Sequence, residues 1–186
     1  MSQTLVVPIF PLPVFLLPQG ITRLRIFEAR YLKMVKIASR EHGFVIYLNR
    51  EEPRNSHWGS WVNIVNFATG DDGILEIDIK CHSLVQVSNQ FSDSDNLAFA
   101  QVDKLPHWAD SFEYGDSAHL AQTLKNFVAS NRQLKDLYTE QPFDNMHWVT
   151  ARWLELLPVS LAVKDQLTSA NNFEATLQFV NSIVKK

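Results

Sequence analysis

Apolar residues near the start of the chain recur at the spacing of a helix. Phe27, Tyr31, Met34, Val35 and Ala38 fall on one stripe, separated by charged and polar positions. Because residues three and four positions apart share a helix face, this spacing predicts an amphipathic helix with all five side chains against a core. The next glycine along the chain marks the expected end of the helix.

A short apolar run, 5–10, precedes that helix and leads into the turn-rich segment 11–20. Proline fixes its backbone angle and cannot donate a backbone hydrogen bond, so closely spaced prolines exclude a helix interior and a central strand alike. The run is therefore predicted to be an edge strand followed by a shaped loop.

After residue 43 the hydrophobic period shortens to that of a strand. The alternation is clearest where Leu75, Ile77 and Ile79 face one way and the charged residues between them face the other. The glycines and aspartates of 70–73 favour a hairpin turn before it. Strands are predicted at 44–48, 61–67, 74–80, 84–87 and 97–105. Short strands of this kind are typical of a small barrel or sandwich.

The second half of the chain carries helix signals only. Helical apolar stripes occur at 120–128, 149–157, 160–167 and 172–184. Ser160 and Asn172 are placed to cap the last two of these helices. The change of pattern across 106–115 predicts a boundary between a β-rich subdomain, 1–110, and a helical subdomain, 111–186. The expected fold class is α+β.

Composition places the chain among folded globular proteins. Of its 186 residues 46% are hydrophobic and 20% charged, a balance that excludes a disordered or fibrous chain. Cys81 is the only cysteine, so no disulfide or thiolate metal cluster can form within one chain, which favours a reducing compartment. We find neither a signal peptide nor an apolar stretch of membrane-spanning length, and expect a cytoplasmic protein without a membrane partner.

The net charge of −3 conceals an uneven distribution. Residues 1–42 carry six Lys or Arg against two acids, whereas residues 43–110 carry four against ten. A basic segment is one signature of nucleic-acid binding, but four of these six cations also fit the solvated face of the predicted helix. Because the acidic segment would repel a phosphate backbone, nucleic acid is not the expected partner.

The sequence lacks the short motifs of cofactor, metal and nucleotide chemistry. None of its six glycines precedes a lysine, which excludes a Walker loop, and no dinucleotide fingerprint, zinc helix or serine elbow occurs. Cys81 and His82 should point to opposite faces of a strand unless a bulge intervenes. The carboxylate pairs Glu51–Glu52 and Asp71–Asp72 lie in turn-like surroundings, where nothing raises a pKa. We therefore expect no catalytic residue, no metal site and no cofactor.

Three tryptophans are candidates for contacts with a partner. Trp58 and Trp61 flank a Gly-Ser pair beside a predicted loop, and Trp108 lies at the predicted junction of the two subdomains. Exposed tryptophans commonly anchor binding partners, but large aromatic rings also dominate protein cores. The sequence leaves both roles open.

The segment Leu24–Tyr31 reads Leu-Arg-Ile-Phe-Glu-Ala-Arg-Tyr. It is similar to the signature of the amino-terminal, substrate-recognition domain of Lon-type ATP-dependent proteases, an apolar-Arg-Ile-Phe-Glu-x-Arg-Tyr block that opens the first helix. The segments Pro8–Leu12, Asp72-Gly73, Leu105-Pro106 and Leu156–Pro158 resemble further parts of that family in order and spacing. The resemblance therefore spans nearly the whole chain.

This resemblance implies a PUA-like β pseudobarrel with one early helix, followed by a carboxy-terminal helical bundle. It also implies recognition without catalysis, because the ATPase and peptidase modules of a full Lon protease are missing here. One departure concerns a strand where the family carries glycine and then Arg-Phe; this chain has Cys81 and Leu84-Val85, so the role of that arginine does not transfer. Within the signature, Arg25, Glu28 and Arg30 are candidates either for binding polypeptide or for holding the fold.

These observations leave three functions open. We expect a non-catalytic protein that binds unfolded or partly folded polypeptide in a cleft near Trp108, with Trp58, Trp61, Arg25 and Arg30 as further candidate contacts. An RNA-binding PUA-like protein is the first alternative, and a small hydrolase is the second. No motif identifies the physiological partner, the oligomeric state or a protease that the chain serves.

Overall fold

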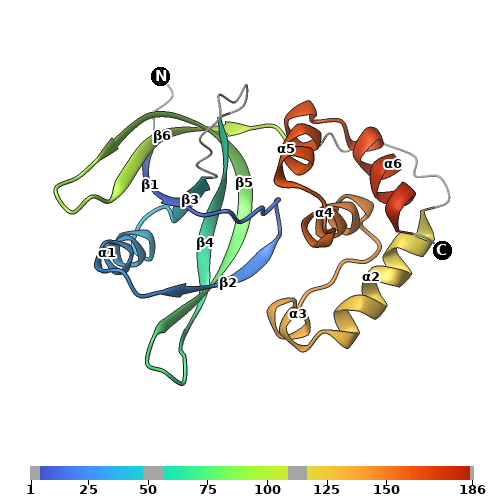
Figure 1. Ribbon diagram of the computed structural model, residues 1–186, viewed down its shortest axis with the longest axis horizontal. Helices are drawn as coiled ribbons and strands as arrows, with labels where there is room; N and C mark the ends of the chain where they lie inside the picture. Colours follow the sequence, from blue (N-terminus) through green and yellow to red (C-terminus); the bar gives the residue numbers. More distant parts are fainter. Residues whose placement is uncertain (1–4, 48–56, 109–116, 185–186) are drawn as a thin grey trace. The chain divides into compact units, whose positions relative to one another are not determined.

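The computed structural model describes residues 5–47, 57–108 and 117–184, and the chain divides into two compact units. Unit 1, Met1–Leu105, holds the six described strands and one helix, whereas unit 2, Pro106–Lys186, holds five helices (Figure 1). This arrangement confirms the α+β class. The subdomain boundary predicted between residues 110 and 111 lies outside the described residues.

Unit 1 is built on one mixed sheet. Its strands are β1 (Leu5–Pro11), β2 (Ile21–Ile26), β3 (Phe44–Tyr47), β4 (Trp58–Thr69), β5 (Leu75–Ser92) and β6 (Ala98–Leu105). They are ordered β2-β5-β4-β3-β1-β6, and β6 pairs with β5 as well as with β1. Five strands therefore form a closed sheet, and β2 is a sixth strand that pairs with β5.

β1 has a neighbour on each side, so the prediction of an edge strand is wrong. It pairs antiparallel with β6 over Leu5–Ile9 and parallel with β3 over Ile9–Pro11. Because the two ladders overlap only at Ile9, each half of β1 keeps one side without a strand partner. That arrangement accommodates Pro8 and Pro11, whose nitrogens cannot donate a hydrogen bond.

β2 is a strand that the hydrophobic pattern did not predict. It pairs with β5 along its whole length, from Ile21 opposite Lys80 to Ile26 opposite Leu75. The signature segment therefore begins in a strand and enters the helix only after Phe27, rather than opening the helix. The alternation of arginine with apolar residues in β2 is the period-two signal that would have identified it.

β5 is longer than predicted because it joins two predicted strands, 74–80 and 84–87. Its pairing with β4 is irregular next to Trp61, where Cys81 and Ser83 both have β4 partners and His82 is the extra residue of a β-bulge. A bulge changes which positions of a strand face inward. The alternating pattern of the sequence is therefore interrupted there.

The interior of the closed sheet is filled mainly by small and β-branched side chains. Its buried members are Val7, Ile9, Val45, Tyr47, Trp61, Val85, Val87, Ala100 and Val102. Gly59 of β4 lies among them, and a Cβ built on it would come within 2.4 Å of Val45 Cγ1. The interior is thus packed too closely for any larger residue at that position.

The helix of unit 1, α1 (Ala29–Ala38), packs against the outer face of the closed sheet, where the ring of Phe10 lies 4.2 Å from that of Tyr31. It buries Tyr31, Met34, Val35 and Ala38. Phe27 does not join this stripe, which corrects its expected place in the core. The helix begins only at Ala29, because Glu28 still has an extended backbone.

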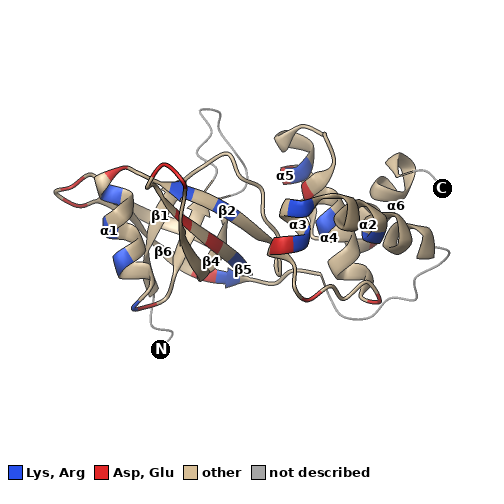
Figure 2. Cartoon of the chain, turned by 90° about the horizontal axis from the view of Figure 1, so that it is seen from below, with Lys and Arg blue, Asp and Glu red and all other residues tan. Residues whose placement is uncertain are grey.

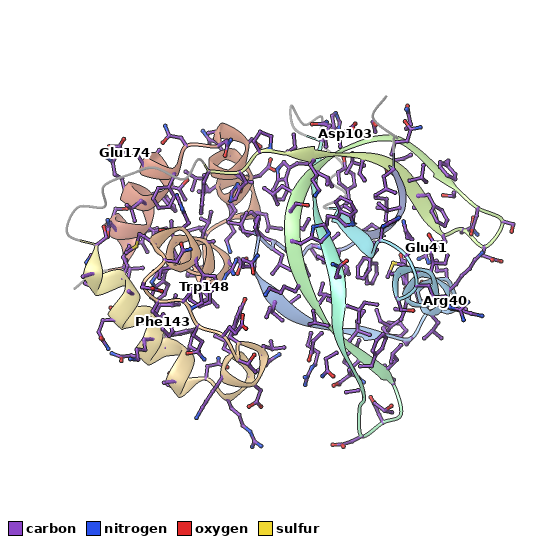
Figure 3. All side chains as sticks on the ribbon, turned by 180° about the vertical axis from the view of Figure 1, so that it is seen from behind. Arg40, Glu41, Asp103, Phe143, Trp148 and Glu174 are labelled. Atoms are coloured by element: carbon purple, nitrogen blue, oxygen red, sulfur yellow. The ribbon has the colours of Figure 1, made fainter. Side chains whose placement is uncertain are left out.

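Unit 2 consists of α2 (Ala118–Ser130), α3 (Arg132–Leu137), α4 (Met146–Leu156), α5 (Leu161–Ala170) and α6 (Phe173–Ile183). In α4, Trp153 donates from Nε1 to the Leu120 carbonyl at 3.0 Å, and Trp148 meets Phe143 edge to face at 5.5 Å (Figure 3). The six-residue α3 was not predicted, because it is too short to show a period. Among the helices described, none has the length and apolar character needed to cross a membrane.

Both predicted caps of unit 2 are confirmed. Ser160 Oγ accepts from the Val163 N–H at 3.3 Å, and Asn172 Oδ1 accepts from the Ala175 N–H at 3.0 Å. Because Asn172→Ala removes the acceptor of a first-turn N–H, we expect it to lower the free energy of unfolding by about 1 kcal/mol, as measured by urea unfolding. Asn172→Ser keeps an acceptor and serves as the control. Equal stability of the two variants would contradict the capping role.

Candidate functional site

An exposed phenylalanine connects β2 to α1. The side chain of Phe27 is 69% exposed, the largest value among the large hydrophobic residues in the described part of the chain. Exposing a phenylalanine to water contributes nothing to the fold, and exposed apolar groups that gather in one region typically form contact surfaces. We call this region the β2–α1 corner and define it by three residues: Arg25, Phe27 and Arg30.

Phe67 of β4 is another exposed phenylalanine, with 53% of its surface accessible. It pairs with Ile77 of β5, which in turn pairs with Leu24 of β2, so these three side chains lie on one face of the sheet. Ile77 and Leu24 are buried, whereas Phe67 remains accessible. Phe67 therefore lies on a different face of these strands from Arg25, which pairs with Glu76.

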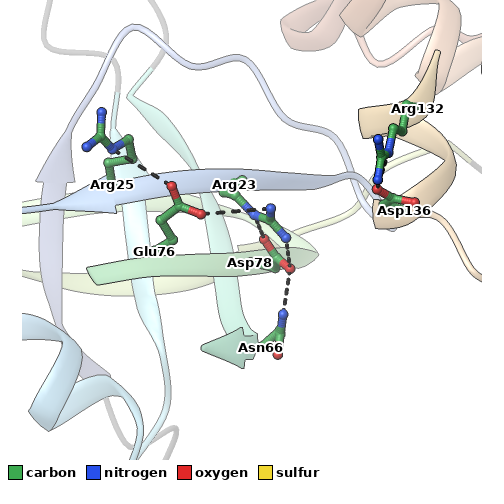
Figure 4. Close-up of polar contacts among 7 residues, drawn as sticks. All are labelled: Arg23, Arg25, Asn66, Glu76, Asp78, Arg132 and Asp136. Atoms are coloured by element: carbon green, nitrogen blue, oxygen red, sulfur yellow. Dashed lines mark hydrogen bonds and ion pairs between the residues drawn. The ribbon is translucent and has the colours of Figure 1, made fainter. Parts of the chain in front are cut away.

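The other face of the same three strands is held by a charged ladder (Figure 4). Arg23 of β2 donates from Nε to Asp78 of β5 at 2.6 Å, and Asn66 of β4 donates to the same carboxylate at 3.0 Å. The hydrogen bonds from Arg23 hold the pKa of Asp78 below its usual range, with a further contribution from Asn66. These contacts fix the register of β2, β5 and β4 relative to one another.

Arg25 extends this network toward the β4–β5 turn. It hydrogen-bonds Asp72, and its Nε lies 3.9 Å from Glu76. The backbone N–H of Ile74 and then the Arg25 side chain lower the pKa of Asp72. The Arg25 side chain remains 50% exposed, so it ties β2 to the turn and stays accessible to a partner.

Arg30, in the first turn of α1, likewise makes contacts within the fold and remains accessible. Its guanidinium binds Glu28 at 2.9 Å and lies 4.7 Å above the ring of Tyr31. Burial raises the pKa of the Tyr31 hydroxyl. These contacts agree with the fold-holding role, which was one of the two roles considered for Arg30. Its side chain is still 39% exposed.

Trp58 is the first residue of β4 and Trp61 lies within it, because the strand begins three residues earlier than predicted. Trp58 is 5% exposed and meets Phe15 edge to face at 5.9 Å. Trp61 is 9% exposed, belongs to the interior of the closed sheet and donates from Nε1 to the His42 carbonyl at 2.6 Å. The structure thus places both rings in the core of unit 1.

Trp108 lies in a cluster of rings within unit 2. It is 7% exposed, stacks on His107 at 4.3 Å and meets Phe173 at 5.0 Å. Its backbone N–H donates to Asn171 Oδ1 at 2.8 Å, and its φ of +39° is in the left-handed region. The ring is therefore an internal packing element of unit 2.

The bulge in β5 brings one hydroxyl close to an imidazole. Ser83 Oγ lies 3.0 Å from His82 Nδ1, a distance that suits a nucleophile and its base. Within the described residues, no carboxylate contacts the imidazole to orient it, as a catalytic triad requires. Cys81 is buried, with its Sγ 3.5 Å from the Ser83 carbonyl, so the bulge does not pair the thiol with His82.

The paired carboxylates show no catalytic arrangement where they are described. Asp71 and Asp72 are exposed in the β4–β5 turn, and Asp72 is bound by Arg25, whereas Glu51 and Glu52 lie outside the described residues. In the described ranges, no group of three or more His, Cys, Asp or Glu side chains is arranged to hold a metal ion.

The basic residues near the start of the chain are largely paired. Arg23, Arg25, Arg30 and Lys33 each contact at least one carboxylate, and Lys33 binds Asp93 at 2.7 Å as well as Asp95. Figure 2 shows Lys and Arg on α1 and β2, whereas the neighbouring β5 carries Asp and Glu as well as Lys. The charge asymmetry of the sequence therefore does not become a concentrated positive surface on these elements.

Sequence analysis missed Phe27 and Phe67 as accessible residues. Helical spacing placed Phe27 in the core, and Phe67 was the last residue of the predicted strand 61–67. The available signal for Phe27 was the alternation in β2, which ends the strand one residue before it. For Phe67 no signal existed, because a bulge between Ile64 and Asn66 changes the alternation inside β4.

Comparisons with solved structures agree with this architecture. A crystal structure of a Lon N-terminal domain protein from Xanthomonas campestris matches with a TM-score of 0.74 and 24% identity, covering 97% of this chain and 99% of that one. The N-terminal domain of Lon protease from Mycobacterium avium complex matches with a TM-score of 0.56 and 14% identity, covering 94% and 95%. At these identities the likeness concerns the fold alone.

Sequence comparison gives the family directly. A search of curated proteins finds no match. Residues 6–186, however, match the family described as the ATP-dependent protease La (LON) substrate-binding domain. The match confirms the resemblance seen in the signature segment and supports a role in substrate recognition rather than catalysis. The chain therefore belongs to the family of Lon protease substrate-binding domains.

Proposed function

We propose that this protein is a non-catalytic recognition module that binds unfolded or partly folded polypeptide at the β2–α1 corner. We propose in addition that its closed sheet is a PUA-like pseudobarrel and that the helices of unit 2 form the helical bundle of the family. A cytoplasmic role in protein quality control follows from this proposal.

The exposure of Phe27 carries the proposal. An unfolded polypeptide differs from a folded protein in presenting apolar side chains, and exposed phenylalanines provide large apolar contact area for them. Phe27, at 69% exposure, is the aromatic anchor of the corner. We assign Trp58, Trp61 and Trp108 to the supporting core, because each is at most 9% exposed.

Charged groups on either side of Phe27 in the sequence suit an extended chain. Arg25 and Arg30 each engage a carboxylate and keep an accessible part of the side chain. They provide a polar rim for carbonyl oxygens and acidic side chains of the bound polypeptide, as in interfaces with an apolar centre. Because the apolar contacts dominate, affinity should depend only weakly on salt.

RNA binding and hydrolysis have weaker support. A phosphate backbone requires unpaired cations, and the ion pairs of Arg23, Arg25, Arg30 and Lys33 neutralise most of the basic segment. For hydrolysis, the contact between His82 and Ser83 lacks an orienting acid among the described residues.

A polarisation titration tests the proposed function. The protein is titrated against a labelled, permanently unfolded polypeptide and a labelled single-stranded RNA, each at low and at high salt. We expect saturable polypeptide binding that persists at high salt. Binding of RNA alone, with affinity that collapses as salt is added, would contradict polypeptide recognition and support the RNA-binding alternative.

A further inference from the structure

Four side chains converge where the bulge in β5 faces the end of β6. The ring of Trp61 lies 4.5 Å from the imidazole of His82, and Lys104 Nζ lies 5.7 Å from the centre of the same indole ring. Ser83 Oγ completes the group, 3.0 Å from His82 Nδ1. We call these residues of three adjacent strands, β4, β5 and β6, the Trp61 cluster.

The cluster offers hydrogen-bond donors that the fold does not use. Burial, with a contribution from the Lys104 charge, lowers the pKa of His82, so the imidazole is neutral at pH 7. When Ser83 donates to Nδ1, the proton of the neutral ring is on Nε2, which has no hydrogen-bond partner among the described residues. Lys104 likewise forms no ion pair in the described part of the chain.

The donors of the cluster suit a carboxylate. One ammonium beside a neutral imidazole gives a net charge of about +1 and two N–H donors, one for each oxygen of a carboxylate. We propose that the Trp61 cluster binds a carboxylate group, with Lys104 Nζ and His82 Nε2 as its donors.

The bulge explains why these groups meet. In a regular strand the neighbours His82 and Ser83 would point to opposite faces, and only one of them would approach Trp61. The extra residue at His82 brings its imidazole to the indole while Ser83 remains paired with Trp61 across the ladder. Bulges commonly redirect a side chain in this way at binding sites.

Nuclear magnetic resonance of the His82 imidazole tests the carboxylate site. Sodium acetate is titrated against sodium chloride at equal ionic strength, and inorganic phosphate is the competing oxyanion. We expect a saturable acetate shift in the unmodified protein and in Lys36→Gln, and affinity about tenfold lower in Lys104→Gln, because a charged hydrogen bond is lost. A response equal to chloride, an unchanged response in Lys104→Gln, or tighter binding of phosphate would overturn the proposal.

Two peptides identify the source of the carboxylate. The assignment to polypeptide rests on the function proposed above, whereas the acetate result does not. An apolar peptide with a free carboxy terminus should bind about tenfold more tightly than its amide, and Lys104→Gln should abolish the difference. Equal binding of the two peptides, with acetate still shifting His82, supports a free carboxylic acid as the ligand. Loss of all peptide binding with an intact acetate response would overturn the proposed function but still support the carboxylate site at the Trp61 cluster.

Discussion

Replacing Phe27 by serine is expected to weaken the binding of unfolded polypeptide at least about tenfold while leaving the fold intact. Central aromatic contacts carry a large share of the energy of an interface. The side chain is 69% exposed and packs on little of the protein, so the free energy of unfolding should change by less than about 0.5 kcal/mol. Polarisation titration and urea unfolding of the same preparation measure the two quantities.

A matched exposed phenylalanine controls for a general loss of surface hydrophobicity. Phe91 belongs to the same unit, is 52% exposed and stacks on Phe99 in the β5–β6 hairpin, away from the residues of the β2–α1 corner in sequence and strand pairing. Phe91→Ser should bind polypeptide as the unmodified protein does. If Phe91→Ser lost as much affinity as Phe27→Ser, the corner would not be the site.

Acid should destabilise unit 2 through His107. Burial lowers the pKa of this imidazole to about 4, and the neighbouring charges of His147 and Arg152 act in the same direction. Neither ring nitrogen of His107 has a hydrogen-bond partner among the described residues. Native His107 is therefore neutral at pH 5, where the unfolded residue, with an ordinary pKa near 6.5, is mostly protonated.

The sign of this effect follows from which state binds the proton. Between pH 6.5 and about 4 the unfolded chain binds a proton at residue 107 that the native protein does not bind, so the free energy of unfolding falls as the pH falls. The full loss below that window is about 3 kcal/mol. His107→Phe keeps a ring against Trp108 and should lack this part of the pH dependence in urea unfolding. Parallel stability profiles of the two proteins from pH 7 to pH 4 would contradict the account.

The regular parts of the fold could be predicted because their periods are undisturbed. The stripe of α1 from Tyr31 to Ala38, the alternation of 75–80 and the caps Ser160 and Asn172 each depend on local spacing, which survives in the structure. The α+β class follows from these elements together. The family resemblance in the signature segment was equally readable, because it depends on residue identity alone.

The rest depends on pairing, which single-strand patterns do not reveal. β1 was predicted as an edge strand because closely spaced prolines exclude a central strand with two complete ladders, whereas the two ladders of β1 overlap only at Ile9. The bulge at His82 disturbs alternation within β5. Such irregularities also decide which aromatic side chains are buried, so the sequence suggested tryptophans as the anchors where the structure exposes phenylalanines.

Photocrosslinking from position 27 tests most directly whether polypeptide binds at the β2–α1 corner. Benzoylphenylalanine replaces Phe27 in one protein and Phe91 in a second, and each is irradiated with the same labelled unfolded polypeptide. We expect strong capture from position 27 and little from position 91, with competition by unlabelled polypeptide. Equal capture from both positions, or capture from position 91 alone, would contradict the assignment of the corner as the binding surface.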